Sequence, residues 1–179
     1  MVRALLAGRK TQTRRLATSP LRRVEIGDRL YVREEWSSHP AFDGIKPRDL
    51  KTGSMIYTRA DNAWHNAGDW IGAPFGRRRP GMHMPRWASR LTLIAEGIVI
   101  EPLQSISEAD AIAEGIEADG AGWRNYTGAR SVAWPDLSYQ TLWDTLHTVV
   151  GERWQDNPSV VALTFRVERS NIDHIGASA

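Results

Sequence analysis

The chain has 179 residues, a length that suits one domain with insertions or at most two small ones, and we expect one domain. Apolar residues make up 41% and charged residues 25%, a balance that argues against disordered, collagen-like and membrane-embedded proteins. The sequence holds no cysteine, which excludes disulfide bonds, thiol nucleophiles and cysteine zinc sites. It shows no run of about 18 apolar residues and no signal peptide, so we expect a cytoplasmic protein with no membrane partner.

The positive charge of the chain is almost entirely arginine. Of the 23 basic residues only Lys10, Lys46 and Lys51 are lysine, and the rest are arginine. Basic clusters lie within residues 1–30 and at residues 77–79. Arginine suits planar contacts with phosphates and bases, so these clusters are typical of a polyanion-binding protein, and equally of an ordinary solvated surface.

The predicted elements follow one another in a mixed order. In the first half, the patterns predict a helix over 2–6, a strand over 29–34 and a Gly- and Pro-rich region over 37–82 that is mostly loop, with one strand near 55–59. In the second half, they predict a strand over 90–100, a helix over 105–115, a loop over 117–135, a helix over 139–149 and a strand over 160–167. Strands and helices do not alternate regularly, so the expected fold class is α+β, with a curled sheet or small β-barrel and flanking helices.

Local signals set the expected ends of two segments. Ser105 is a possible N-cap, with Glu108 at the capping-box position three residues later, and Gly115 ends this helix. Beyond Arg169 the sequence predicts a flexible tail.

Several kinds of site are excluded because their motifs are missing. The segment 8–11 (GRKT) resembles the end of a phosphate-binding loop but lacks the upstream glycine and the Gly-Lys pair. The five histidines show no metal-binding spacing, and no serine-hydrolase motif is present. We therefore expect neither a metal nor a cofactor.

One pair of residues in the polar segment 9–15 could carry chemistry. If the segment forms a helical turn, Lys10 and Thr13 lie three residues apart and face one cavity. A threonine hydroxyl needs a base, and an amine serves only if desolvation and neighbouring cations lower its pKa from about 10.4. The alternative is that Lys10 is one more cation of a basic run and Thr13 an ordinary turn residue.

Five segments in this order resemble the ASCH-domain family, named for activating-signal-cointegrator homology. They are Leu5–Arg15 (LLAGRKTQTRR), Gly27–Glu34 (GDRLYVRE), Met84–Arg90 (MPRWASR), Leu142–Asp144 and Asn157–Pro158. The resemblance runs from residue 2 to about 168 and is strongest to the longer branch found in phages and prophages.

The resemblance implies a PUA-like β-barrel related to RNA-binding modules, with a cleft beside the GRKT segment. It implies a single domain over 1–169, with insertions at about 37–82 and 117–138 and a tail over 170–179. Members of the longer branch usually begin with a short hydrophobic strand, and this chain starts where that strand would already have ended. We therefore expect that an added upstream strand would stabilise the barrel.

Small bacterial members of the family hydrolyse N4-acetylcytidine to cytidine and acetate. The resemblance assigns their lysine, threonine and glutamate to Lys10, Thr13 and Glu114, and so implies that Glu114 approaches Lys10. In the expected mechanism Thr13 attacks the acyl carbonyl, Lys10 takes its proton, and Glu114 orients Lys10 or passes the proton to the leaving amine. If Glu114 lies elsewhere, Glu34 or Glu35 is the next candidate.

The remaining expected contacts concern the substrate. The candidates for binding it are Arg9, Arg15, Tyr57, Arg86 and Trp87, with Arg15 near the oxyanion and the two aromatic rings stacking on the base. The expected partner is a modified cytosine nucleoside or RNA. The alternative function is a noncatalytic RNA-binding module that uses the same basic motif to hold phosphate.

Overall fold

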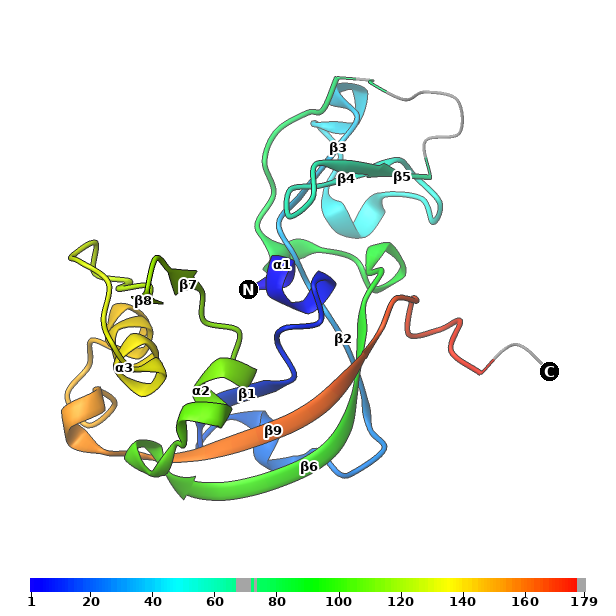
Figure 1. Ribbon diagram of the computed structural model, residues 1–179. Helices are drawn as coiled ribbons and strands as arrows, with labels where there is room; N and C mark the ends of the chain where they lie inside the picture. Colours follow the sequence, from blue (N-terminus) through cyan, green and yellow to red (C-terminus); the bar gives the residue numbers. More distant parts are fainter. Residues whose placement is uncertain (67–71, 73, 177–179) are drawn as a thin grey trace. The chain divides into compact units, whose positions relative to one another are not determined.

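The computed structural model describes residues 1–66, 72 and 74–176 (Figure 1). These residues form a small mixed α/β protein with a curled antiparallel sheet and few helices, which agrees with the expected α+β class. Their contacts divide into two compact units. The first holds residues 1, 3–28 and 94–166, and the second holds residues 2, 29–93 and 167 onward. No helix of the described ranges is long and apolar enough to cross a membrane.

The first unit is built on long strands and three helices. Its helices are α1 (Val2–Leu6), α2 (Glu108–Ala113) and α3 (Pro135–Leu146), with 3-10 turns at Pro20–Arg23, Leu103–Ser105 and Trp154–Asp156. Its strands are β1 (Gln12–Leu16), β6 (Thr92–Pro102), β7 (Ala118–Asp119), β8 (Gly122–Trp123) and β9 (Ser159–Glu168). The strands expected over 90–100 and 160–167 are therefore present as β6 and β9.

The curled sheet of this unit places β9 between β1 and β6. Both β6 and β9 are long and bend along their length (Figure 1). β1 runs antiparallel to β9, with Thr13 opposite Leu163 and Arg15 opposite Val161. The expectation of a polar turn over 9–15 is thus wrong for residues 12–15, because this polar segment pairs with the apolar β9 as part of the sheet.

The N-cap of the helix α2 lies two residues later than the sequence predicts. Ser107, not Ser105, is its N-cap, and the capping box is completed by Asp110 rather than Glu108. The Ser107 hydroxyl accepts a hydrogen bond from the Asp110 backbone N–H at 3.1 Å. Ser105 instead ends a 3-10 turn that carries the chain away from β6. The helix ends as expected before Gly115, which has φ +83°.

The helix α3 begins at Pro135, earlier than the start at residue 139 that the apolar pattern predicts. Its first residue is Pro135, which suits the first turn of a helix because that position needs no N–H donor. Its buried face packs with α2 and β9 into the core of the unit. This core consists of Leu103, Ile106, Ala111, Ile116, Tyr139, Trp143 and Val160.

The second unit contains more structure than the loop expected over 37–82. Its strands are β2 (Arg29–Tyr31), β3 (Trp36–Ser38), β4 (Ile56–Thr58) and β5 (Ala63–His65), and 3-10 turns lie at Pro40–Phe42, Pro47–Asp49, Gly81–His83 and Arg86–Ala88. β3, β4 and β5 form an antiparallel sheet in chain order, and β4 confirms the strand expected near 55–59. The buried residues Trp36, Leu50, Ile56 and Met84 form its core. β3 and β5 are three residues each, too short to give a clear alternating pattern.

Residues 170–176 are held by side-chain contacts, where the sequence predicts a flexible tail. The Asn171 amide donates to the carbonyl oxygens of Arg86, Trp87 and Ser89 at 2.9, 3.2 and 2.6 Å. Ile172 is buried beside it. Residues 177–179 of the expected tail lie outside the described residues.

Candidate functional site

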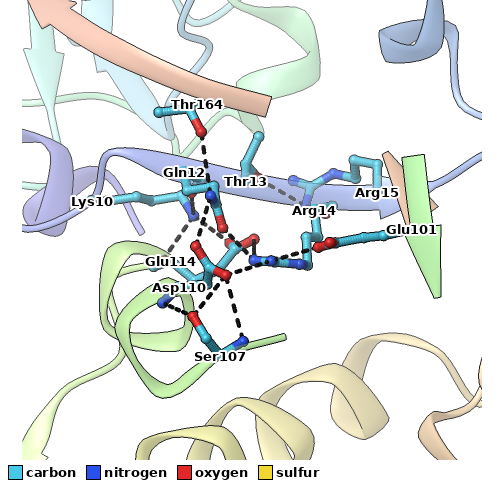
Figure 2. A network of polar contacts seen from close by, with 10 residues as sticks. All are labelled: Lys10, Gln12, Thr13, Arg14, Arg15, Glu101, Ser107, Asp110, Glu114 and Thr164. Carbon is cyan, nitrogen blue, oxygen red and sulfur yellow. Dashed lines mark hydrogen bonds and ion pairs between the residues drawn. The ribbon is translucent and has the colours of Figure 1, made fainter. Parts of the chain in front are cut away.

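The first unit holds a buried network of charged side chains beneath β1 (Figure 2). Side chains of a strand alternate between its two faces, so Gln12 and Arg14 point toward α2 while Thr13 and Arg15 point away from it. Lys10 precedes the strand and lies on the side of Gln12. The network therefore joins the start of β1 to the end of α2, two segments about one hundred positions apart in the sequence.

Lys10 is only 4% exposed, and all three donors of its ammonium group are used. Its Nζ donates to the Gln12 carbonyl at 2.7 Å, to the Glu114 carbonyl at 2.8 Å and to the Glu114 Oε2 at 2.7 Å. The Glu114 carbonyl lies at the C-terminal end of α2, where a cation is favourable. The expected approach of Glu114 to Lys10 is therefore confirmed.

Glu114 is 1% exposed and holds its two carboxylate oxygens in different environments. Oε2 pairs with Lys10. Oε1 accepts no hydrogen bond, and the nearest cationic atom of Arg14 lies 3.7 Å away. A buried carboxylate oxygen without a donor is costly, and Oε1 is the one oxygen of this carboxylate that accepts no hydrogen bond.

Burial changes the pKa of both partners. Desolvation lowers the pKa of Lys10 from 10.5, more than the Glu114 charge raises it. Desolvation also raises the pKa of Glu114 from 4.5, against the opposing effects of Lys10 and Arg14. Both shifts favour the neutral forms, which brings an amine and a carboxylic acid closer in proton affinity than they are in water.

Arg14 carries the network outward from Glu114. It is 1% exposed and donates from Nη2 to Glu101 Oε1 at 2.8 Å, and it also hydrogen-bonds the Gln12 side chain through Nη1. Asp110 Oδ2 lies 3.3 Å from Nη2. These contacts fix the guanidinium close to Glu114. Burial raises the pKa of the Tyr139 hydroxyl well above its usual value, and the Glu114 charge adds to this effect.

Gly115 allows Lys10 to pack against the end of α2. Its φ is +83°, and a Cβ added there would lie 2.9 Å from the Cβ atoms of both Ala4 and Lys10. Thr11 continues this contact, because its backbone N–H donates to the Ala113 carbonyl at 2.9 Å. The two segments that carry Lys10 and Glu114 are thus held together by backbone geometry as well as by charge.

Thr13 is not placed as the expected mechanism requires. It lies on the side of β1 away from Glu114, and its hydroxyl accepts a hydrogen bond from Arg15 Nη1 at 3.3 Å (Figure 2). Lys10 makes no hydrogen bond to it, so the pairing of a Thr13 nucleophile with a Lys10 base is not present. The reason is the strand: residues three apart face the same way on a helix and opposite ways on a strand.

The other expected substrate contacts are divided between the two units. In the first unit, Arg9 Nη1 reaches the Ile116 carbonyl at 3.4 Å, and Arg15 also donates to the Arg14 carbonyl at 2.8 Å. Tyr57, Arg86 and Trp87 belong to the second unit.

Within the second unit these three side chains are engaged in their own contacts. Tyr57 is buried and stacks on Phe75 with ring centroids 4.5 Å apart. Trp87 packs against the core of the unit. Arg86 is exposed and binds Asp173 through Nε and Nη2, with the closest contact at 2.7 Å.

Members of the network that were not predicted as site residues include Gln12, Arg14, Glu101 and Asp110. Two signals point to three of them in retrospect. Gln12 and Arg14 share one face of a strand, and Asp110 precedes Glu114 by four residues, one helical turn. Within the described ranges no group of three or more His, Asp or Glu side chains is arranged to hold a metal ion.

Comparison of the chain with protein-family profiles, with curated protein sequences and with solved structures finds no match in any of the three.

Proposed function

We propose that this chain is an amidohydrolase that removes the acyl group from an N4-acylated cytosine nucleoside, with N4-acetylcytidine as the reference substrate. The observation that carries the proposal is the buried pair of Lys10, in the GRKT segment, and Glu114, at the end of α2. Buried ionisable groups with shifted pKa values are characteristic of catalytic sites, although structural ion pairs share this property. The curled sheet beside the pair is compatible with the PUA-like barrel that the resemblance implies.

The geometry suggests how the pair moves protons. In the proposed step, Oε1 of Glu114, which accepts no hydrogen bond, takes a proton from an attacking water while the water oxygen bonds to the acyl carbon. The same proton, or one from Lys10, then passes to the exocyclic nitrogen as the C–N bond breaks. The products are a carboxylic acid and the free amine of cytosine, and the proton of the pair is restored.

This mechanism differs from the one expected from sequence in its nucleophile. Water replaces Thr13, because the Thr13 hydroxyl lies on the far side of β1 and contacts Arg15. Lys10 remains essential as the group that positions Glu114 and tunes its pKa.

The test is release of cytidine from N4-acetylcytidine by the purified chain, measured by chromatography. Lys10→Met is expected to lower the rate by about 100-fold or more, the usual range for loss of an acid–base group, whereas Lys51→Met, at an exposed site in the second unit, leaves it unchanged. Thr13→Val is expected to keep most of the activity. A loss with Thr13→Val as large as with Lys10→Met would return the nucleophile to Thr13, and no activity in the unmodified chain would favour a binding module.

A further inference from the structure

The second unit contains a basic pocket that the proposed hydrolysis does not use. Its cavity volume is about 590 Å³. The polar and aromatic side chains that line it are Tyr31, Arg33, Lys46, Arg48, His83 and Arg86. None of the described residues in its lining carries a carboxylate. A cavity of this size matches a ligand as large as one nucleotide.

The positive charge of this pocket is only partly neutralised. Arg86 is paired with Asp173 at 2.7 Å, and Arg48 lies 3.9 Å from Asp49. Arg33 donates only to the Met82 carbonyl, and neither it nor Lys46 forms an ion pair with a described residue. Two exposed cations therefore face the pocket without a counter-charge, as a site for phosphate requires.

The pocket also presents flat surfaces. The guanidinium carbons of Arg33 and Arg86 lie 5.9 and 5.6 Å from the centre of the Tyr31 ring. Aromatic rings and guanidinium planes are the protein groups on which unstacked bases lie in single-stranded nucleic acids. Cationic side chains that can bind phosphate and flat groups on which a base can stack thus line the same cavity.

We propose that this pocket binds single-stranded nucleic acid, with Arg33 and Lys46 holding backbone phosphates and Tyr31 with its neighbouring guanidinium groups holding an unstacked base. A duplex is a poor ligand, because its bases are stacked on one another and cannot reach Tyr31. The inference concerns the second unit alone and does not depend on hydrolysis at Lys10 and Glu114.

The charge contribution is tested by fluorescence anisotropy with a labelled single-stranded RNA of about 12 nucleotides, within the range that single-strand-binding folds cover. The double variant Arg33→Gln/Lys46→Gln is expected to bind about tenfold more weakly or worse. It should also reduce the slope of log affinity against log salt by about 1.4, which corresponds to two lost phosphate contacts. The matched control Arg22→Gln/Arg23→Gln removes the same charge from exposed positions of the first unit and should have little effect. Equal losses in both variants, or no binding by the unmodified chain at low salt, would overturn the proposal.

The base contact is tested by Tyr31→Leu, with circular dichroism to show that the variant is folded. This change is expected to weaken binding of the single strand several-fold and to leave the weaker binding of duplex RNA unchanged. Free cytidine monophosphate, which offers one phosphate, should compete only weakly. Equal affinity for single strand and duplex, unaltered affinity in Tyr31→Leu, or competition by the mononucleotide at the same concentration as the oligomer would each contradict a single-stranded polymer as the ligand.

Discussion

Lys10 and Glu114 form an ion pair in which both side chains are buried, and each depends on the other. A buried ion pair adds little net stability when intact, because its attraction is offset by the cost of removing both charges from water. Removing one partner leaves the other charge buried and unpaired, which is far more costly. The intact pair therefore adds little net stability to the fold, whereas the loss of either partner is expected to be strongly destabilising.

We predict a strongly non-additive mutant cycle at this pair. Lys10→Met and Glu114→Gln alone are each expected to lower the free energy of unfolding by about 3 to 5 kcal/mol, and the double variant by much less than the sum. Urea unfolding followed by circular dichroism measures all three. Glu117→Gln, which breaks the exposed pair with Arg124, is the control and should change stability little. Additive losses at Lys10 and Glu114 would show that the two side chains do not interact.

The raised pKa of Glu114 predicts a pH dependence of stability. Between pH 4.5 and the raised value the folded chain keeps a proton that the unfolded chain has lost, so the free energy of unfolding falls as pH rises through this window. The contribution is complete below pH 4.5, where both states are protonated. Urea unfolding at a series of pH values from 4.5 upward should show this fall in the unmodified chain relative to Glu114→Gln. Parallel curves for the two proteins would mean that the pKa of Glu114 is not raised.

At the scale of elements, helices and strands could be predicted from the sequence where they are long and apolar. The strands β6 and β9 were predicted from β-branched runs, and the helix before Gly115 was predicted with its end correct but its N-cap at Ser105 instead of Ser107. The polar strand β1 was not, because Gln12, Thr13 and Arg14 have no alternating apolar pattern and become a strand only through pairing with β9. Pairing with β9 also determines which way the Thr13 side chain points. Glu114 was placed correctly beside Lys10, whereas the helical spacing assumed for Thr13 placed its side chain on the same side as Lys10, opposite to the side that the strand gives it.

The contact between α2 and the Lys10 segment should be sensitive to any side chain at Gly115. Gly115→Ala adds a Cβ that meets Ala4 and Lys10 at 2.9 Å, in addition to the strain of a positive φ. The matched control is Gly120→Ala, which has φ +61° and open space around it. We expect Gly115→Ala to cost about 1 to 3 kcal/mol more than the control, as overpacking typically does, when thermal or urea unfolding is compared. Equal costs would mean that the end of α2 shifts freely away from Lys10.

At the scale of the whole molecule, the chain forms two compact units, and each carries its own candidate site. The first holds the buried Lys10 and Glu114 network, and the second holds the basic pocket around Tyr31. The second unit includes residues that precede β6 and residues that follow β9 in the sequence, among them Asn171. The single domain over 1–169 stays a prediction.

The return of the chain end to the second unit predicts a role in stability for Asn171. Its amide group donates to three backbone carbonyls of residues 86–89, so Asn171→Ala removes these hydrogen bonds, including the buried one to the Ser89 carbonyl. We expect a loss of about 1 to 3 kcal/mol in the free energy of unfolding, measured by urea titration. Asp173→Asn weakens only an exposed pair two residues later and should have little effect. If both variants match the unmodified chain, residues 170–176 do not contribute to stability.

Glu114 is proposed to transfer the proton in hydrolysis of an N4-acylated cytosine. The most direct measurement is the rate of cytidine release from N4-acetylcytidine by Glu114→Gln and by Glu96→Gln, at a temperature where circular dichroism shows both to be folded. Glu96 is an exposed carboxylate of β6, so its variant is a matched control. The account predicts a fall in kcat/KM of about 100- to 10,000-fold for Glu114→Gln and none for Glu96→Gln. A folded Glu114→Gln protein that hydrolyses the substrate at the unmodified rate would contradict it.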